Sequence, residues 1–373
     1  MPSLVALDLP GGPDFVAHLQ GVWERGDAVL PIDQRLPDGA KRRILEALRP
    51  SMVIDTNGEH RIDGGLPTAS GDAVVVATSG STGDPKGVVL TQAAVEASAR
   101  ASSRALQVDG TDQWLACLPM AHIGGLSVVT RALVTGVPVT VLPAFDADEV
   151  TRIAHQCTLT ALVGTTLQRI DPRVFRMILL GGGRPPRDRP ANTVATYGLT
   201  ETGSGVVYDG RPLEDVEIAI AHDGEILLRG PMLMRCYRDG TTSIDTDGWL
   251  HTDDLGRMGS DGSLQVDGRR GDVIVTGGQK VWPDPVEACL APAMSTTDYC
   301  VLGLPDQQWG ERVVLVTTDA SVSLDRIRGL VKESLPAYCA PHEIVVVDRI
   351  DRTALGKIRR TALRQRLVDQ RSN

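Results

Sequence analysis

The stretch from Thr78 to Gly87 restricts this chain more than any other part of its sequence. It reads Thr-Ser-Gly-Ser-Thr-Gly-Asp-Pro-Lys-Gly and follows the apolar run 73–77. Three glycines let backbone N–H groups approach an anion closely, four hydroxyl side chains add donors, and Lys86 supplies a positive charge. The stretch therefore predicts a phosphate-binding loop, although a polar surface turn would explain two or three of its residues.

This loop differs from the P-loop of nucleoside triphosphatases. The P-loop pattern needs Gly-Lys followed by Ser or Thr, whereas Pro85 precedes the lysine here. Residues 88–90 predict a short strand, and Thr91 is a good N-cap residue for a helix. The loop is therefore expected to join two strands, without a helix dipole behind the bound phosphates.

Composition excludes several classes of protein. The 373 residues suffice for two or three domains, and the net charge of -9 comes without a Lys/Arg block, which argues against nucleic acid or anionic membrane as a partner. The six cysteines lie far apart without a C-x-x-C pair, which argues against a disulfide framework or a zinc site. No signal peptide and no apolar run near about eighteen residues is present, so we expect a soluble, cytoplasmic protein without membrane insertion.

The order of apolar runs predicts an α/β fold. Amphipathic segments around 15–23, 40–48 and 146–155 alternate with short apolar strands such as 28–30, 159–163 and 177–180. The pattern changes after Gly268, where a smaller region ends in a basic segment. We therefore expect a large N-terminal domain of sheets flanked by helices, residues 1–268, and a small α+β C-terminal domain, residues 269–373, with a hinge at 269–271.

Two glycine-rich turns follow predicted strands in the second third of the chain. Residues 181–183 are three consecutive glycines, and residues 197–203 read Tyr-Gly-Leu-Thr-Glu-Thr-Gly. Such turns allow a purine to lie against backbone, with Tyr197 as a stacking face. Mg²⁺ prefers one or two carboxylates together with phosphate oxygens, so Glu201 is the best metal ligand in the sequence; the alternative is a buried, ion-paired glutamate.

These motifs, in this order, resemble those of the acyl-adenylate-forming (AMP-forming ligase) superfamily over nearly the whole chain, with a shortened front. The resemblance implies ATP, Mg²⁺ and coenzyme A as cosubstrates or cofactors, and a carboxylic acid as substrate. Residue patterns and resemblance together give the following ATP-binding residues: Thr78, Ser79, Gly80, Ser81, Thr82, Gly83, Lys86, Gly181, Gly182, Gly183, Tyr197, Gly198, Asp254 and Arg269. Asp254 is the residue expected at the ribose hydroxyls, with a turn-capping role as the alternative.

The resemblance also implies which residues perform the chemistry. The expected catalytic residues are Lys357, the mobile lysine near the C-terminus, with Thr200, Glu201 and His122. His122 follows Leu-Pro-Met-Ala and would orient the acyl group, although a lone histidine is more often structural. Gly271 is the expected pivot of the hinge, because glycine serves two domain orientations, and Gly277 with Gly278 would lie beside the pantetheine of coenzyme A.

The acid itself is suggested by a narrower resemblance. The run 197–213 resembles the short actinobacterial o-succinylbenzoate–CoA ligases, which act in menaquinone biosynthesis. The expected substrate contacts are His122, Thr165, Arg169 and Ser204; Arg169 suits a second carboxylate, or else is a solvated helix arginine. Other aryl or medium-chain acids, a carrier-protein thiol in place of coenzyme A, a non-catalytic nucleotide-binding homologue and a homodimeric assembly stay open.

Overall fold

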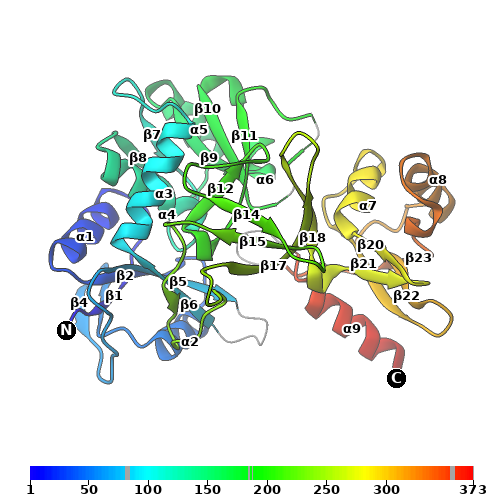
Figure 1. The fold of residues 1–373 in the computed structure, drawn as a ribbon, viewed down its shortest axis with the longest axis horizontal. Helices are drawn as coiled ribbons and strands as arrows, with labels where there is room; N and C mark the ends of the chain where they lie inside the picture. The colour runs from blue at the N-terminus through cyan, green and yellow to red at the C-terminus, as the bar shows by residue number, and fades with distance from the viewer. Residues whose placement is uncertain (80–84, 184, 187, 353–357, 373) are drawn as a thin grey trace. The chain divides into compact units, whose positions relative to one another are not determined.

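The computed structural model describes residues 1–372 except 80–84, 184, 187 and 353–357 (Figure 1). Contacts divide the chain into two compact units. The large unit comprises 1–219, 227–252 and 259–264, and the small unit comprises 220–226, 253–258 and 265–373. The domain boundary expected at 268 stays a prediction, whereas the α/β class is confirmed by the sheets and helices described below.

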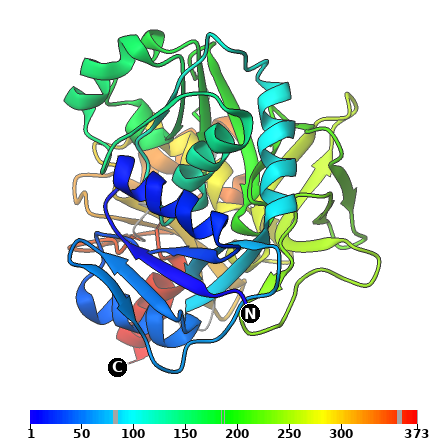
Figure 2. The same cartoon turned by 90° about the vertical axis from the view of Figure 1, so that its left-hand side faces the viewer.

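The first sheet of the large unit contains the hairpin on either side of the predicted phosphate loop. Its seven strands lie in the order β16-β6-β5-β2-β1-β3-β4. Their bounds are β1 Leu4–Asp8, β2 Ala28–Pro31, β3 Met52–Asp55, β4 Gly58–Arg61, β5 Asp72–Ser79, β6 Pro85–Thr91 and β16 Cys236–Tyr237. β5 and β6 pair in antiparallel fashion, so the predicted phosphate-binding stretch begins and ends in two paired strands, as expected. Figure 2 shows α1 (Pro13–Glu24) on β1 and β2, where it buries Phe15, Leu19 and Val22.

The second sheet contains five parallel strands. Its order is β13-β12-β11-β10-β9-β7-β8, with β7, β8, β9, β10 and β11 parallel. The bounds are β7 Trp114–Ala116, β8 Val139–Val141, β9 Leu159–Val163, β10 Met177–Gly181, β11 Thr193–Leu199, β12 Ser204–Tyr208 and β13 Arg211–Pro212. One face is covered by a buried apolar cluster that includes Leu115, Leu162 and Ile178 together with Val150 and Ile153 of α5.

Helices complete the layers of the large unit (Figure 1). They are α2 Asp38–Leu48, α3 Gln92–Ala105, α4 Ile123–Thr135, α5 Ala147–Ile153 and α6 Gly164–Leu167, with 3-10 turns η1 Ala154–Gln156, η2 Pro172–Val174 and η3 Thr200–Thr202. The predicted cap is present: Thr91 Oγ1 accepts a hydrogen bond from Ala94 N at 3.1 Å at the start of α3. α4 ends at Gly136, whose φ of 73° suits glycine.

A third sheet has residues in both units. Its order is β14-β15-β17-β18, with bounds Glu217–Ile220, Glu225–Arg229, Leu250–Met258 and Leu264–Arg269. The small unit adds a fourth sheet of β19 Ile274–Thr276, β20 Gln279–Val281, β21 Tyr299–Asp306, β22 Gly310–Thr317 and β23 Glu343–Val346. Its other elements are α7 Pro283–Leu290, α8 Leu324–Ser334, α9 Arg360–Ser372, η4 Arg270–Asp272, η5 Ala291–Ala293 and η6 Ala337–Cys339.

The fourth sheet is covered on both faces. Successive side chains of a β-strand point to opposite faces of the sheet, so β21 and β22 contribute residues to both faces. Val301, Val313 and Leu315 are buried in a cluster with residues of α7 and α8. Leu302 and Val314 belong to a second cluster with Leu363 and Leu367 of α9. The small unit is therefore a three-layer α+β body with its own core.

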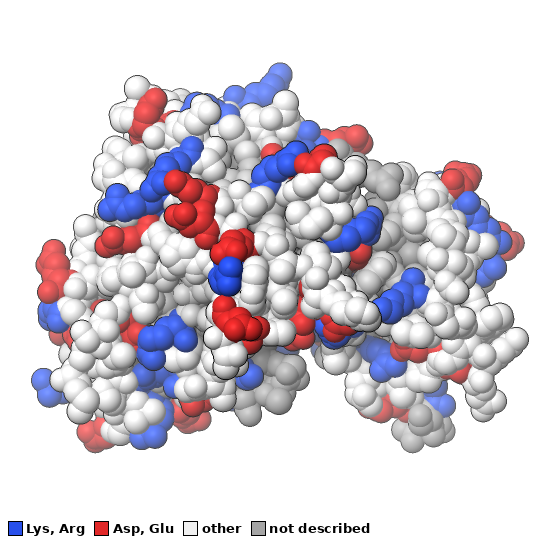
Figure 3. All heavy atoms as spheres, viewed as in Figure 1, with Lys and Arg blue, Asp and Glu red and all other residues white. Residues whose placement is uncertain are grey.

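The surface carries charges of both signs. On the face drawn in Figure 3, Lys and Arg side chains alternate with Asp and Glu, and neither sign forms a broad patch on the visible described residues. In the part of the chain that the structure describes, no helix is both long enough and apolar enough to cross a bilayer.

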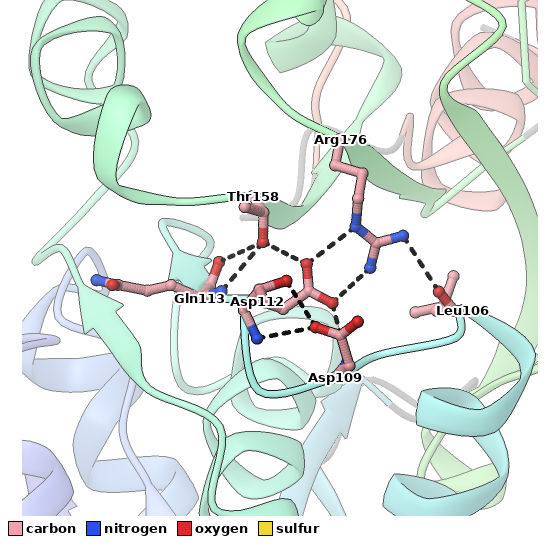
Figure 4. A network of polar contacts seen from close by, with 7 residues as sticks. Leu106, Asp109, Asp112, Gln113, Thr158 and Arg176 are labelled. Carbon is pink, nitrogen blue, oxygen red and sulfur yellow. Dashed lines mark hydrogen bonds and ion pairs between the residues drawn. The ribbon is translucent and has the colours of Figure 1, made fainter.

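A buried carboxylate ties together the amino ends of three parallel strands (Figure 4). Asp112 precedes β7, and its oxygens accept hydrogen bonds from Arg176 Nε at 2.9 Å and Nη2 at 2.6 Å, just before β10. Thr158, just before β9, donates to Asp112 Oδ1 at 2.6 Å. Burial alone would raise the pKa of Asp112, but the hydrogen bonds from Arg176 and Thr158 outweigh burial and hold this pKa below its usual range.

Replacing this carboxylate should destabilise the protein in a pH-dependent way. We expect Asp112→Asn to lower the free energy of unfolding at pH 7 by about 1.5–3 kcal/mol, because charge-assisted hydrogen bonds to a buried group are lost. The lowered pKa means that the wild-type advantage is complete above the ordinary carboxyl pKa of about 3.9 and disappears as the pH falls through the folded-state pKa. Urea denaturation of both proteins between pH 7 and pH 3 measures the difference; a gap that stays constant over this range contradicts the assignment.

Candidate active site

Predicted site residues converge at one edge of the second sheet. Parallel strands present their carboxyl ends at the same edge, where ligands of open α/β sheets bind. His122 follows β7, Thr165 and Arg169 follow β9, and residues 181–183 begin at the last residue of β10. β11 runs directly into η3, which carries Thr200 and Glu201. The candidate residues on four strands are therefore brought to one side of the large unit.

The η3 turn is held by the buried residue Thr202. Its Oγ1 accepts a hydrogen bond from Leu199 N at 2.9 Å and lies 2.7 Å from Ser204 O. Gly198 is required beside it, because a Cβ there would lie 2.2 Å from Ser204 O. Gly198 thus permits close packing of β11 against β12. The hydrogen bonds of Thr202 hold the turn that carries Thr200 and Glu201.

Tyr237 connects the phosphate loop to the predicted metal ligand. Lys86 Nζ lies 5.2 Å from the centre of the Tyr237 ring, within cation–π range. The Tyr237 hydroxyl donates a hydrogen bond to Glu201 Oε1 at 3.0 Å. The cation of Lys86 and the carboxylate of Glu201, separated by more than a hundred residues, therefore both contact one aromatic side chain.

Sequence reasoning missed Tyr237. It lies in β16, which pairs with β6 so that Tyr237 is opposite Val88, two residues beyond Lys86. The η3 turn is also tied to this segment, since Met234 N donates to Glu201 O at 2.7 Å. A two-residue strand gives no periodicity, so only the pairing partner reveals the position of this tyrosine.

His122 belongs to a three-residue polar cluster that the sequence did not predict. His122 Nε2 lies 3.2 Å from Asp33 Oδ2, and Arg35 Nη2 lies 2.7 Å from the same oxygen. Asp33 follows β2 and is 5% exposed, whereas Arg35 is partly exposed. Burial would raise the pKa of Asp33, but hydrogen bonds from His122 and Arg35 outweigh it and hold that pKa far below its ordinary value. An ionised carboxylate therefore orients the imidazole.

The predicted substrate contacts differ in their surroundings. Thr165 and Arg169 are exposed, and the guanidinium of Arg169 stacks 4.9 Å above the ring centre of Phe145. Ser204 is 6% exposed, and its hydroxyl lies 3.1 Å from Ser98 Oγ in α3. Ser204 is therefore placed as a packing residue under the turn, which favours a structural role over the predicted contact with substrate.

The nucleotide candidates of the large unit are partly described. Thr78 and Lys86 are paired across the β5–β6 hairpin, whereas Gly80, Ser81, Thr82 and Gly83 lie outside the described residues, and Ser79 is described only as the last residue of β5. Gly182 has a φ of 82° and Gly183 is exposed, so residues 181–183 form an open, glycine-dependent turn. Tyr197 is half-buried in β11 beside it.

In the small unit, the structure brings Asp254 and Arg269 together. Arg269 Nε lies 3.1 Å from Asp254 Oδ1, from strands β18 and β17. Asp253, which precedes it, has a φ of 57° and so adopts a left-handed conformation that favours glycine. Aspartate is one of the few residues other than glycine that tolerate this conformation.

The predicted hinge and the predicted coenzyme A contact differ in whether their backbone conformation requires glycine. Gly277 and Gly278 have φ of 55° and 76° and join β19 to β20 as a two-residue hairpin loop, for which this dipeptide is well suited. Gly271 lies in η4 with a φ outside the left-handed region, and a Cβ there would meet nothing within 4 Å. The conformation described therefore requires glycine at 277 and 278 but not at 271.

Lys357 lies outside the described residues, but its flanks are fixed. Arg352 and Ile358 pair as an antiparallel bridge, and Arg352 Nε donates to Asp298 Oδ1 at 3.0 Å. On the other side, Arg360 Nη2 donates to Glu287 Oε1 at 2.6 Å. The segment that contains the predicted catalytic lysine is therefore attached at both ends to the body of the small unit.

The residues present fit a magnesium ion that is completed by a ligand. Among the described residues, no group of three His, Cys, Asp or Glu side chains is placed to hold a metal. Mg²⁺ commonly uses one or two carboxylates and takes its remaining ligands from phosphate oxygens and water. Glu201, a half-buried carboxylate beside the phosphate hairpin, satisfies that requirement.

The left-handed position of Asp253 gives a direct test of the backbone argument. We expect Asp253→Val to lower the free energy of unfolding by about 1–2 kcal/mol, because a β-branched residue is strained at this φ, and Asp253→Gly to cause no loss. Urea denaturation of the three proteins measures this. Equal stability of the Val and Gly variants would show that the conformation is not retained in solution.

Comparison with known proteins identifies the family of the chain. The family model described as "AMP-binding enzyme" matches residues 66–238, and that described as "AMP-binding enzyme C-terminal domain" matches 285–357. A Mycobacterium tuberculosis protein named "Probable 2-succinylbenzoate--CoA ligase" is 36% identical, with 89% of this chain and 95% of the relative covered. A Listeria monocytogenes 2-succinylbenzoate–CoA ligase is 32% identical, with 79% and 70% covered.

A solved structure extends the similarity to three dimensions. O-succinylbenzoate coenzyme A synthetase from Bacillus subtilis, solved with ATP and magnesium ion, is 27% identical and has a TM-score of 0.85, covering 97% of this chain and 89% of that chain. The large N-terminal and smaller C-terminal parts expected from the sequence are confirmed by this similarity. On this identity, coverage and fold, the chain belongs to the family of AMP-binding enzymes.

Proposed function

We propose that this protein is an ATP-dependent carboxylate–CoA ligase that acts through an acyl-AMP intermediate, with o-succinylbenzoate as its acid in menaquinone biosynthesis. The observation that carries the proposal is the contact series Lys86–Tyr237–Glu201, which joins the phosphate hairpin to the predicted magnesium ligand. The names of the relatives support the choice of acid, since each is a 2-succinylbenzoate–CoA ligase.

The chemistry explains why such residues are needed. A carboxylate cannot pass its acyl group to a thiol directly, because oxide is a poor leaving group. One carboxylate oxygen attacks the α-phosphorus of ATP, the bond to the β-phosphate oxygen breaks, and pyrophosphate leaves with that electron pair. Negative charge accumulates on phosphate oxygens in the transition state, so fixed donors and cations aimed at them lower the barrier.

In this proposal each residue has one task. The loop from Thr78 to Lys86 holds the β- and γ-phosphates, Thr200 and Lys357 contact the α-phosphate, and Asp254 holds the ribose. Magnesium held by Glu201 would supply charge neutralisation on the phosphates when bound. Tyr237 positions the Glu201 carboxylate through its hydrogen bond, and Asp33 orients His122 at the incoming acid.

The second half-reaction transfers the acyl group from AMP to the thiol of coenzyme A. The thiolate attacks the acyl carbonyl and AMP leaves. For this step we propose that the small domain rotates about Gly271, so that the turn of Gly277 and Gly278 replaces Lys357 beside the acyl-adenylate.

Two assays test the function. With o-succinylbenzoate, ATP and coenzyme A, we expect thioester and AMP to form, and acid-dependent exchange of labelled pyrophosphate into ATP in the absence of coenzyme A. A panel of benzoate, medium-chain and dicarboxylic acids tests the substrate, and a carrier protein in place of coenzyme A tests the acceptor. Exchange with a different acid refutes only the choice of acid, whereas no exchange with any acid favours a non-catalytic homologue.

Lys357→Ala should abolish adenylation while leaving ATP binding intact. We expect pyrophosphate exchange to fall by on the order of 10²- to 10³-fold, the scale for loss of one group that stabilises transition-state charge. ATP affinity, measured by calorimetry, should change little because the loop and Glu201 are unaltered. Lys332→Ala, at an exposed position on α8, is the matched control and should retain exchange. Full exchange by Lys357→Ala would refute its role.

Gly271→Ala should separate the two half-reactions. A Cβ meets nothing within 4 Å at 271, so we expect unchanged stability and pyrophosphate exchange within about two-fold. Thioester formation should fall several-fold, because the second orientation needs backbone angles that alanine disfavours. Gly329→Ala on α8, equally free of contacts, is the control and should affect neither half-reaction. Thioester formation at the wild-type rate would contradict the pivot.

Assembly and location complete the proposal. A homodimer and a cytoplasmic location are expected for such an enzyme. Light scattering on the purified full chain tests the first, and cell fractionation tests the second.

A further inference from the structure

The residues on the two sides of Gly271 are attached to different sheets by their side chains. β18 of the third sheet ends at Arg269 and β19 of the fourth sheet begins at Ile274, so the short turn η4 joins the two sheets. Gly271 has no side chain, whereas Arg270 before it and Asp272 after it each form an ion pair. These two pairs therefore limit which bonds of the connection can rotate.

Arg270 is attached to the third sheet. Its Nη1 lies 2.9 Å from Asp223 Oδ2, and its Nη2 lies 3.4 Å from Glu225 Oε2. Asp223 lies between β14 and β15, and Glu225 begins β15. Glu225 Oε1 also accepts a hydrogen bond from Asp253 N at 2.9 Å. Two carboxylates thus fix the residue before the predicted pivot to this sheet.

Asp272 is attached to two helices of the small unit through Arg360. Its Oδ2 lies 3.9 Å from Nη1 of Arg360, the first residue of α9. Nη2 of the same guanidinium donates to Glu287 Oε1 at 2.6 Å and to Glu287 Oε2 at 2.7 Å. It also lies 3.4 Å from Asp284 Oδ1, and both of these acidic residues belong to α7. One arginine therefore joins η4, α7 and α9.

The balance of charge makes Arg360 the residue on which this attachment depends. Its side chain is 20% exposed and carries one positive charge beside three carboxylates. Burial raises the pKa of Asp272, and the charge of Arg360 opposes that rise. Without the guanidinium, the carboxylates of Asp272, Asp284 and Glu287 would repel one another in partly buried surroundings. The residue after the pivot would then lose its attachment to α7 and α9.

We propose that Arg360 is a positioning residue for the rotation of the small domain. Through Asp272 it fixes the residue after the pivot, while Arg270 fixes the residue before it, so that the change of orientation is confined to Gly271. A rotation confined to one residue has defined end orientations, whereas a connection that is free at several residues samples many. The inference rests on the proposed function, because the rotation serves the two half-reactions.

Asp272→Asn separates this positioning role from a purely structural one. Because the pKa of Asp272 is raised in the folded protein, a neutral replacement should not lower the free energy of unfolding at pH 7. Loss of the contact with Arg360 should nevertheless lower kcat several-fold in both half-reactions, with the dissociation constant for ATP unchanged. Wild-type kcat in this variant would contradict the role.

Arg360→Met should have a larger effect, because it removes the partner of all three carboxylates. We expect kcat to fall on the order of ten-fold, since small displacements of reacting groups are costly. Arg364→Met is the matched control: Arg364 is also on α9 but pairs with Glu311 of β22 at 2.8 Å. This control should lose stability and keep its kcat. Equal losses of kcat in the two variants would overturn the proposal.

Amide hydrogen exchange examines the connection without an assay of activity. In peptides that contain residues 268–276, we expect faster deuterium uptake in Asp272→Asn and Arg360→Met than in the wild type, and wild-type uptake in Arg364→Met. Unchanged uptake in both of the first two variants would overturn the inference. Lack of activity of the wild-type protein with every acid would instead refute the proposed function.

Discussion

The shared edge of four parallel strands is the constraint on which the candidate active site depends. Because β7, β9, β10 and β11 run in the same direction, whatever follows each strand must emerge on one side of the sheet. The phosphate hairpin comes from a different sheet, so it needs a separate connection to that edge. Tyr237 provides this connection. It lies in β16, which pairs with the hairpin strand β6, and the Tyr237 hydroxyl donates a hydrogen bond to Glu201.

The two edges of the second sheet have different tasks. At the amino ends, Asp112, Thr158 and Arg176 are mutually satisfied and bind strands to one another. At the carboxyl ends, Thr165, Arg169 and residues 182–183 are exposed. Polar groups that satisfy each other stabilise a fold, whereas a ligand site needs polar groups whose partners are supplied by the ligand. In this sheet the two kinds of polar group lie at opposite ends of the strands.

The sequence predicted what depends on local chemistry. Thr91 was recognisable as a cap and the apolar runs as strands, because each is determined by neighbours along the chain. Tyr237, Asp33 and Arg35 were missed because their roles arise from strand pairing between distant segments. Ser204 shows the converse: its place in a conspicuous motif suggested a substrate contact, yet the hydroxyl is buried against Ser98. The family itself was recognised from the ordered motifs and is confirmed by the relatives.

In the small unit, ion pairs attach the residues that flank the predicted catalytic segment. Arg352 and Arg360 hold the flanks of 353–357 by ion pairs to Asp298 and Glu287, within the small unit itself. Both ion pairs are partly exposed, and they attach the residues on either side of 353–357 to the body of the small unit. At Gly271, a Cβ would meet nothing within 4 Å, so the conformation described does not require glycine there. A requirement for glycine at this position would therefore come from a second conformation.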